Sequence, residues 1–164
     1  MTFARTQWVW MNGEVIPWSK ATTHVSAHGL HYGTGVFEGI RCYATNNGPA
    51  LFRVEEHLAR FFASAEIHGI EIPFSSDHLT EAITRVIREN GFNACYVRPI
   101  AYFGSGSLSL YPRECAVEVV ILVWPWADYL GAEGQKRGVS VTVSPWRKFE
   151  SKMMPTTAKA CGQY

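Results

Sequence analysis

The sequence has little charge and no long apolar run. Only 18% of its 164 residues are charged, compared with about 25% in an average soluble protein. Its 15 Lys and Arg nearly balance its 14 Asp and Glu, for a net charge of +1, which argues against a nucleic acid or a membrane surface as partner. No segment approaches the ~18 apolar residues of a membrane span, and residues 1–7 contain no apolar signal-peptide core. These absences predict a cytoplasmic protein.

The chain also lacks the cysteine spacing of a metal or redox site. It has four cysteines: Cys42, Cys95, Cys115 and Cys161. None of them forms a CxxC pair, and Cys95 and Cys115 lie beside or within apolar runs, as buried thiols do. His28 and His31 are close in sequence, but no Cys, Asp or Glu nearby completes a ligand set. We therefore expect no metal site and favour hydrogen-bonding roles for these histidines.

Apolar and turn-forming residues, by contrast, follow clear periods. Alternation and turn residues predict paired strands at 8–11 with 14–17 and at 36–44 with 50–54, and further strands at 95–103, 116–124 and 139–143. Helical periodicity predicts a helix over 55–68, a second from the Ser75 cap to before Gly91, and a short one over 128–136. This order is an α+β pattern. Aromatic residues, at 13%, supply more apolar surface than a small monomer easily buries.

The segment richest in reactive groups is HGLHYGTGVFEGIR, residues 28–41. Its four glycines allow the backbone to turn sharply and to approach a bound group closely. Between them lie two imidazoles, a phenol, a phenyl ring, a carboxylate and a guanidinium. This composition fits either a tight aromatic corner that caps a sheet or a ligand pocket.

A second segment, MPTTAKACGQY at residues 154–164, surrounds Lys159 with small residues. Small neighbours leave room for a planar group against the backbone. A lysine held there can lose its proton and attack an aldehyde, which is the chemistry of a Schiff base. The plain alternative is a solvated lysine at the start of a helix.

Together with EHLARF (56–61), YVRP (96–99) and YLG (129–131), these segments resemble the class IV pyridoxal-phosphate-dependent aminotransferases, and most closely the branched-chain amino-acid aminotransferases. The D-amino-acid aminotransferases and the aminodeoxychorismate lyases share the fold and the lysine, so they remain alternatives. The resemblance covers essentially the whole chain. The chain differs from the family at Cys161, where family members usually have Gly, and at Gln163, where they usually have Asn. Neither difference changes the lysine itself.

The resemblance implies pyridoxal 5'-phosphate as the cofactor. Lys159 would hold the cofactor as a Schiff base and move a proton during the reaction. Arg60 would bind the phosphate, whose geometry suits a guanidinium fork, and Tyr164 would hydrogen-bond the ring oxygen. Without the resemblance, Arg60 would be a solvated helix residue and Tyr164 a frayed terminal one.

The resemblance also implies a substrate pocket for leucine, isoleucine or valine. Its residues would be Tyr32, Phe37, Gly39, Tyr96, Arg98, Leu110, Trp126 and Tyr129. Arg98 would receive the distal carboxylate of glutamate, and Leu110 would reach the pocket of a neighbouring subunit. Independently, Tyr96 and Arg98 stand two apart on one strand and face the same side, and an arginine in an apolar strand is costly unless paired. A purely structural ion pair is the alternative for Arg98.

The implied reaction exchanges an amino group between a branched-chain L-amino acid and 2-oxoglutarate, giving the 2-oxo acid and L-glutamate, in a homodimer or larger homo-oligomer. The expected architecture is a small α/β domain over 1–125 with a mixed or antiparallel sheet and two helices, an interdomain segment over 126–132, and the start of a larger pseudo-barrel domain over 133–164.

Family members are longer, and this chain stops five residues after Lys159. We therefore expect it to lack the groups that bind the cofactor's ring nitrogen, the rest of its phosphate and the substrate α-carboxylate. The isolated chain is accordingly expected to be inactive. The second hypothesis is a noncatalytic fragment that associates with a full-length partner.

Overall fold

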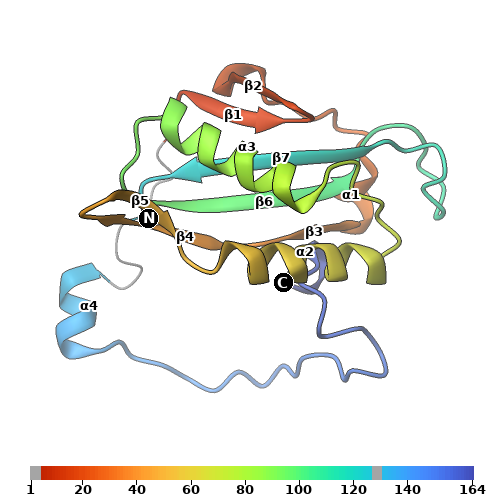
Figure 1. Cartoon of the computed structure of the whole chain (residues 1–164). Helices are drawn as coiled ribbons and strands as arrows, with labels where there is room; N and C mark the ends of the chain where they lie inside the picture. Colours follow the sequence, from red (N-terminus) through yellow and green to blue (C-terminus); the bar gives the residue numbers. More distant parts are fainter. Residues whose placement is uncertain (1–4, 127–130) are drawn as a thin grey trace.

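The computed structural model describes residues 5–126 and 131–164. Its centre is an antiparallel sheet with the strand order β2-β1-β7-β6-β4-β5, in which β3 also pairs with β6 (Figure 1). The strands are β1 (Trp8–Met11), β2 (Glu14–Pro17), β3 (Gly35–Phe37), β4 (Ile40–Thr45), β5 (Gly48–Leu51), β6 (Cys95–Phe103) and β7 (Val117–Trp124). With two long helices on this sheet, the predicted α+β class is confirmed.

The long strands β6 and β7 form the middle of the sheet, with Tyr96 opposite Trp124 and Phe103 opposite Val117. Successive side chains on a strand point to opposite faces. One face is fully buried and carries Cys95, Val97, Ala101, Val119, Ile121 and Val123. The opposite face, which carries Tyr96 and Arg98, is only half-buried.

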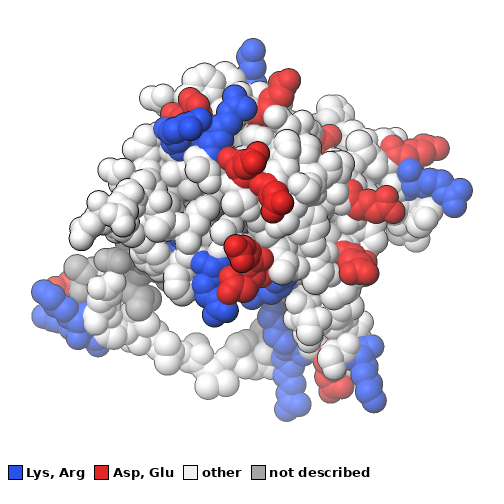
Figure 2. Space-filling model, viewed as in Figure 1, with Lys and Arg blue, Asp and Glu red and all other residues white. Residues whose placement is uncertain are grey.

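Helices α2 (Val54–Ile67) and α3 (Ser76–Glu89) cover the buried face of the sheet (Figure 1). Each presents an apolar stripe to it: Leu58, Phe61 and Ala65 from α2, and Leu79, Ile83, Val86 and Ile87 from α3. Full burial of a large apolar side chain contributes about 1.5–3 kcal/mol, so the stripes hold both helices in place. On this side of the molecule, basic and acidic side chains are interspersed (Figure 2).

The predicted signals at helix ends and at the first hairpin are confirmed. The Ser75 hydroxyl accepts a hydrogen bond from the His78 N–H at 3.1 Å, which caps the N-terminus of α3. Gly91 follows the C-cap of α3 with φ +68°. Between β1 and β2, Asn12 and Gly13 have φ of 51° and 101°, as a type I′ turn requires.

The predicted strand over 36–44 is two strands, because Glu38 and Gly39 separate β3 from β4. At the break, the Glu38 N–H donates to the Pro99 carbonyl at 2.9 Å. Pro99 has no N–H with which to return the bond, so the ladder is interrupted there. The partner strand begins at Gly48, not Ala50, because Thr45 and Gly48 pair directly across a tight turn.

The strand predicted over 139–143 is wrong. Val139, Val141 and Val143 are 53%, 87% and 94% exposed, and in the described part of the chain this segment pairs with no strand. Within the described residues, this segment has neither a neighbouring strand to pair with nor an apolar surface against which its valines could pack, and a stable strand needs both. It runs as an irregular loop away from the sheet (Figure 1).

The remaining elements are short. The helix predicted over 128–136 is described from Gly131 as α4 (Gly131–Arg137), and residues 128–130 lie outside the described residues. The others are η1 (Trp18–Lys20), α1 (His28–Tyr32) and η2 (Cys161–Gln163). Within the described ranges, no helix combines the length and the apolarity needed to cross a membrane.

Candidate active site

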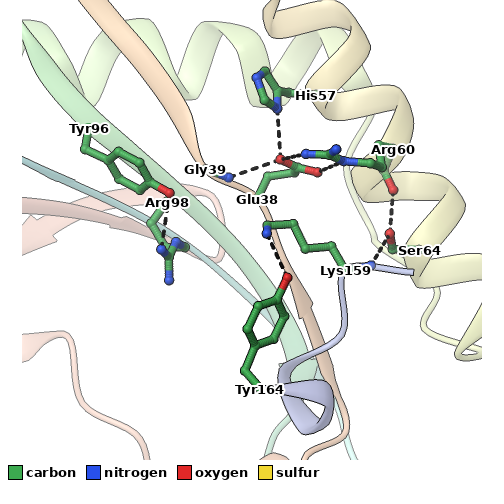
Figure 3. Close-up of polar contacts among 9 residues, drawn as sticks. All are labelled: Glu38, Gly39, His57, Arg60, Ser64, Tyr96, Arg98, Lys159 and Tyr164. Atoms are coloured by element: carbon green, nitrogen blue, oxygen red, sulfur yellow. Dashed lines mark hydrogen bonds and ion pairs between the residues drawn. The ribbon is translucent and has the colours of Figure 1, made fainter. Parts of the chain in front are cut away.

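The segment around Lys159 is fixed to both the sheet and a helix. Ala160 forms an antiparallel bridge with Val36 of β3, and the Phe37 N–H donates to the Lys159 carbonyl at 3.0 Å. On the other side, the Lys159 N–H donates to the Ser64 hydroxyl of α2, also at 3.0 Å. The backbone of Lys159 is therefore held from two directions. Figure 3 shows the contact with Ser64 and, on the other end of the side chain, the amine turned toward Tyr164.

The Lys159 amine lies in a pocket of about 400 Å³, within the range of ligand sites. Its Nζ donates to the Tyr164 hydroxyl at 3.1 Å and lies 4.7 Å from the centre of the Phe37 ring. The pocket is lined by Arg60, Lys148, Phe149, Met154, Thr156, Thr157, Ala158, Lys159, Gln163 and Tyr164. This described lining contains three basic side chains and no acidic side chain, so it favours an anionic ligand.

Arg60 is held at the edge of this pocket by a buried carboxylate. Glu38 is fully buried in the break between β3 and β4. Both its oxygens accept from Arg60, with Nη2 at 2.8 Å; the His57 Nδ1 lies at 2.9 Å and the Gly39 N–H at 3.1 Å (Figure 3). This bidentate pairing fixes the orientation of the guanidinium.

Electrostatics reinforce that arrangement. Burial alone would raise the pKa of Glu38, but the hydrogen bonds from Arg60, His57 and the Gly39 N–H outweigh it and hold this pKa below its ordinary value. The pKa of Arg60 is raised, first by the hydrogen bond to Glu38. Both groups therefore remain charged near neutral pH, and the pair persists.

Glu38, His57 and Ser64 were not predicted as site residues from the sequence. The sequence did contain a signal for Glu38, because a carboxylate in an apolar strand needs a partner. The same reasoning, applied to a guanidinium, pointed to Arg98. For Ser64, the signal was a serine on the apolar side of a helix. Nothing local marked His57, which contacts Glu38 only once α2 lies over the β3–β4 break.

A second cluster of predicted residues lies on the half-buried face of the sheet. The Arg98 guanidinium lies 4.5 Å from the Phe37 ring centre, and its Nη2 donates to the Tyr96 hydroxyl at 3.3 Å. Tyr96 stacks on Trp126 with ring centres 4.5 Å apart. The Arg98 Nε is buried without a hydrogen-bond partner, and among the described residues no carboxylate forms an ion pair with Arg98.

Gly39 lies directly against this cluster. A Cβ at position 39 would be 1.8 Å from the Tyr96 hydroxyl oxygen, so only glycine fits there without displacing the ring. Since Phe37 contacts both Lys159 and Arg98, the cluster is continuous with the Lys159 pocket. Besides Arg60, seven of the predicted residues are thus brought together: Lys159, Tyr164, Phe37, Gly39, Arg98, Tyr96 and Trp126.

Two predicted pocket residues lie elsewhere. The Tyr32 hydroxyl donates to the Leu108 carbonyl at 2.8 Å, and Leu110 is 85% exposed. Both belong to the region around α1 and the loop between β6 and β7, and no contact in the described structure joins them to Lys159. Tyr129 lies outside the described residues.

The histidines near α1 make hydrogen bonds. The His28 Nδ1 lies 2.8 Å from the Thr34 hydroxyl and its Nε2 lies 3.0 Å from the Ser109 carbonyl oxygen, which confirms the predicted hydrogen-bonding role. In residues 5–126 and 131–164, no group of three or more His, Cys, Asp or Glu is arranged to hold a metal ion.

A separate groove of about 440 Å³ runs over the half-buried face of the sheet. Its described lining, which includes Trp18, Leu30, Ile100, Tyr102 and Leu122, contains no Lys, Arg, His, Asp or Glu. Its reactive groups are the hydroxyls of Thr22, Thr23 and Tyr102 and the Cys161 thiol, and burial raises the pKa of both Tyr102 and Cys161. The Lys159 pocket is therefore the candidate active site, although it is the smaller of the two.

The chain is similar to known proteins in both sequence and structure. The chain is 41% identical to the branched-chain-amino-acid aminotransferase of Escherichia coli K12 over 165 aligned positions, which cover all of this chain and 53% of that protein. The chain thus spans about half the length of the curated relatives it matches. The crystal structure of an Escherichia coli branched-chain amino acid aminotransferase superposes on 97% of the chain and 53% of that structure, with a TM-score of 0.93 and 41% identity.

A further match is the T.th. branched-chain amino acid aminotransferase complexed with N-(5'-phosphopyridoxyl)-L-glutamate. It has a TM-score of 0.87 and 41% identity, over 97% of this chain and 51% of that one. The model of the amino-transferase class IV family matches residues 35–163, which include the Glu38–Arg60 pair, the Arg98 cluster and Lys159. The chain therefore belongs to the class IV aminotransferase family.

Proposed function

We propose that the full-length protein is a branched-chain amino-acid aminotransferase that uses pyridoxal phosphate. The observation that carries this proposal is the pairing of Lys159 with Arg60 in one cation-lined pocket, continuous with an aromatic cluster that contains Arg98. The relatives at 41% identity favour the branched-chain reaction over those of the D-amino-acid aminotransferases and aminodeoxychorismate lyases.

The residues present fit this cofactor. Its phosphate would bind at Arg60, whose guanidinium Glu38 already orients, in a described lining without acidic side chains. Tyr164 would orient the ring through the hydroxyl that now contacts Lys159. When bound, pyridoxal phosphate supplies an aldehyde that reacts with amines and a ring that withdraws electrons from the substrate Cα.

The protein's own part is positioning and proton transfer. Lys159 would hold the cofactor and then, as a free amine, take a proton from the substrate Cα and return it to the cofactor, because its Nζ lies between the Tyr164 hydroxyl and the Phe37 ring and a positioned amine can act as a general base. Phe37, Tyr96 and Trp126 would form apolar walls for an aliphatic side chain. Those walls would also exclude water from the transferred proton.

Arg98 would distinguish the two amino-group partners. Its positive charge lies among aromatic rings, with the Nε buried and unpaired. An anion at this position would satisfy it, and only glutamate and 2-oxoglutarate carry a second carboxylate. An aliphatic substrate would instead pack against Phe37 and Tyr96. One pocket could therefore accept both classes of substrate in turn.

We further propose a cytoplasmic homodimer or larger homo-oligomer, with residues 1–125 as the small domain and 133–164 as the start of the larger one. The separation of Tyr32 and Leu110 from Lys159, together with the exposure of Leu110, supports a role for these residues in the pocket of another copy. The four cysteines are all free thiols, as expected in a reducing compartment. Sedimentation of the full-length protein tests the assembly.

The experiment that tests the activity is a transamination assay on the full-length protein with added pyridoxal phosphate and 2-oxoglutarate. We expect L-leucine, L-isoleucine and L-valine to yield glutamate, and D-alanine to yield none. Lys159→Ala serves as the inactive control. Preference for D-alanine, or turnover of aminodeoxychorismate without turnover of leucine, would assign the protein to one of the other reactions of the family.

A further inference from the structure

Ser64 is the side chain that joins the two proposed cofactor-binding residues. It lies on α2 one turn after Arg60 and is 1% exposed. Its hydroxyl donates to the Arg60 carbonyl at 2.7 Å and accepts from the Lys159 N–H at 3.0 Å. Figure 3 shows this bridge between α2 and the segment of Lys159.

Helix formation does not account for a serine at this position. Serine is a poorer helix former than alanine, because its hydroxyl competes for backbone hydrogen bonds. Its neighbour Ala65 is also buried on α2, with a side chain that carries no polar group. An alanine at position 64 would therefore suit both the helix and the core, unless the hydroxyl has a partner outside the helix.

That partner is the Lys159 N–H, which among the described residues donates to no acceptor other than the Ser64 hydroxyl. The Lys159 carbonyl is occupied by the Phe37 N–H, and the flanking Ala158 and Ala160 are buried, so water has little access from either side. A serine hydroxyl has one donor and two acceptor sites. Donation to Arg60 orients its lone pairs, and one of them faces Lys159.

We propose that Ser64 is a positioning residue, whose hydroxyl sets the placement of the Lys159 backbone relative to Arg60 and so holds the lysine amine within reach of a cofactor bound at Arg60. This inference rests on the proposed function and adds a residue to it. Loss of the hydroxyl leaves Lys159 attached to β3 alone, through the Phe37 hydrogen bond and the Ala160 bridge. The lysine would then keep its chemistry and lose its fixed position.

The test compares Ser64→Ala with Thr80→Ala in the full-length protein. Thr80 is a matched control on α3, because its hydroxyl makes the same bond to the carbonyl four residues earlier, Ser76, at 3.0 Å, and the residue is only half-buried. The first measurement is hydrogen exchange of the Lys159 amide in the cofactor-free protein. We expect about tenfold faster exchange in Ser64→Ala, the scale of one lost hydrogen bond, and no change in Thr80→Ala.

The second measurement is the affinity for pyridoxal phosphate, titrated by absorbance. We expect about tenfold weaker binding in Ser64→Ala, with the KM for leucine unchanged. Ser64→Thr keeps the hydroxyl and should restore both readouts; if it behaves like the alanine variant, the hydroxyl is not the cause. Unchanged exchange at Lys159, or faster exchange with unchanged cofactor affinity, would overturn the proposal. Since exchange requires neither cofactor nor turnover, this result is independent of whether the protein is a transaminase.

Discussion

Replacement of Glu38 by glutamine tests whether the buried carboxylate organises the site. The Glu38 oxygens accept from four donors: two nitrogens of Arg60, the His57 ring and the Gly39 N–H. Glutamine keeps the size of the side chain but offers one acceptor oxygen and turns an NH₂ group toward donors. Glu38→Gln therefore places donor against donor in a fully buried position.

The magnitude follows from the exposure of each partner. Removal of one member of a fully buried ion pair costs about 3–5 kcal/mol. The Glu38 side chain is fully buried, but the Arg60 side chain is 52% exposed, so water screens the charge that is left behind. We therefore expect Glu38→Gln to reduce the free energy of unfolding by about 2–3 kcal/mol and to weaken pyridoxal phosphate binding, because Arg60 loses its fixed orientation.

Urea denaturation of the full-length protein, followed by circular dichroism, measures the first effect, and cofactor titration measures the second. Glu56→Gln is the matched control. Glu56 lies on α2, the helix that carries Arg60, and pairs with Arg53 on the surface, where an ion pair contributes little to stability. If the two variants have equal urea midpoints and equal cofactor affinities, Glu38 does not organise this site.

Three more predictions concern the same pocket. The hydrogen bonds lower the pKa of Glu38, so the contribution of Glu38 to stability is present above the unfolded carboxyl pKa of about 4.3 and is lost as the pH falls through the lower folded value. The free energy of unfolding should therefore fall less steeply on acidification in Glu38→Gln than in the wild type, and equal slopes would contradict this. Gly39→Ala places a Cβ against the Tyr96 hydroxyl. This change should raise the KM for leucine about tenfold or more and leave the cofactor affinity nearly unchanged; an unchanged KM would mean that the Tyr96 ring moves freely. Arg98→Met should slow the half-reaction with glutamate roughly 30- to 1,000-fold, since a lost charge-assisted contact costs ~2–4 kcal/mol, and should affect leucine much less; an equal fall for both substrates would show that Arg98 is structural.

Local signals predicted most of the fold. The Asn12-Gly13 turn and the Ser75 cap each depend on a few neighbouring residues, and the alternation in β6 reflects its burial on one face. The split between β3 and β4 could not be predicted this way, because it depends on Pro99, which is remote in the sequence. The strand predicted over 139–143 failed for a related reason, since alternation describes a strand's faces and not whether a neighbour exists.

The candidate site was predictable only in part, and mainly through resemblance to a family. Lys159, Arg60 and Tyr164 were selected by their motifs, and Arg98 also by the cost of a charge in an apolar strand. Ser64 was not selected, because its importance depends on a hydrogen bond to a residue 95 positions away. Tertiary contacts of this kind leave no periodic trace in a sequence.

The most direct test of the central claim is to identify the lysine that binds pyridoxal phosphate. Borohydride reduction of the loaded full-length protein fixes the cofactor to its lysine, and peptide mapping then locates it. We predict the label on the peptide that contains Lys159, and no label in Lys159→Ala. The serious competitor is Lys148, which lines the same pocket and donates to the Gln163 carbonyl. Label on Lys148 or on any other lysine would contradict the proposed role of Lys159.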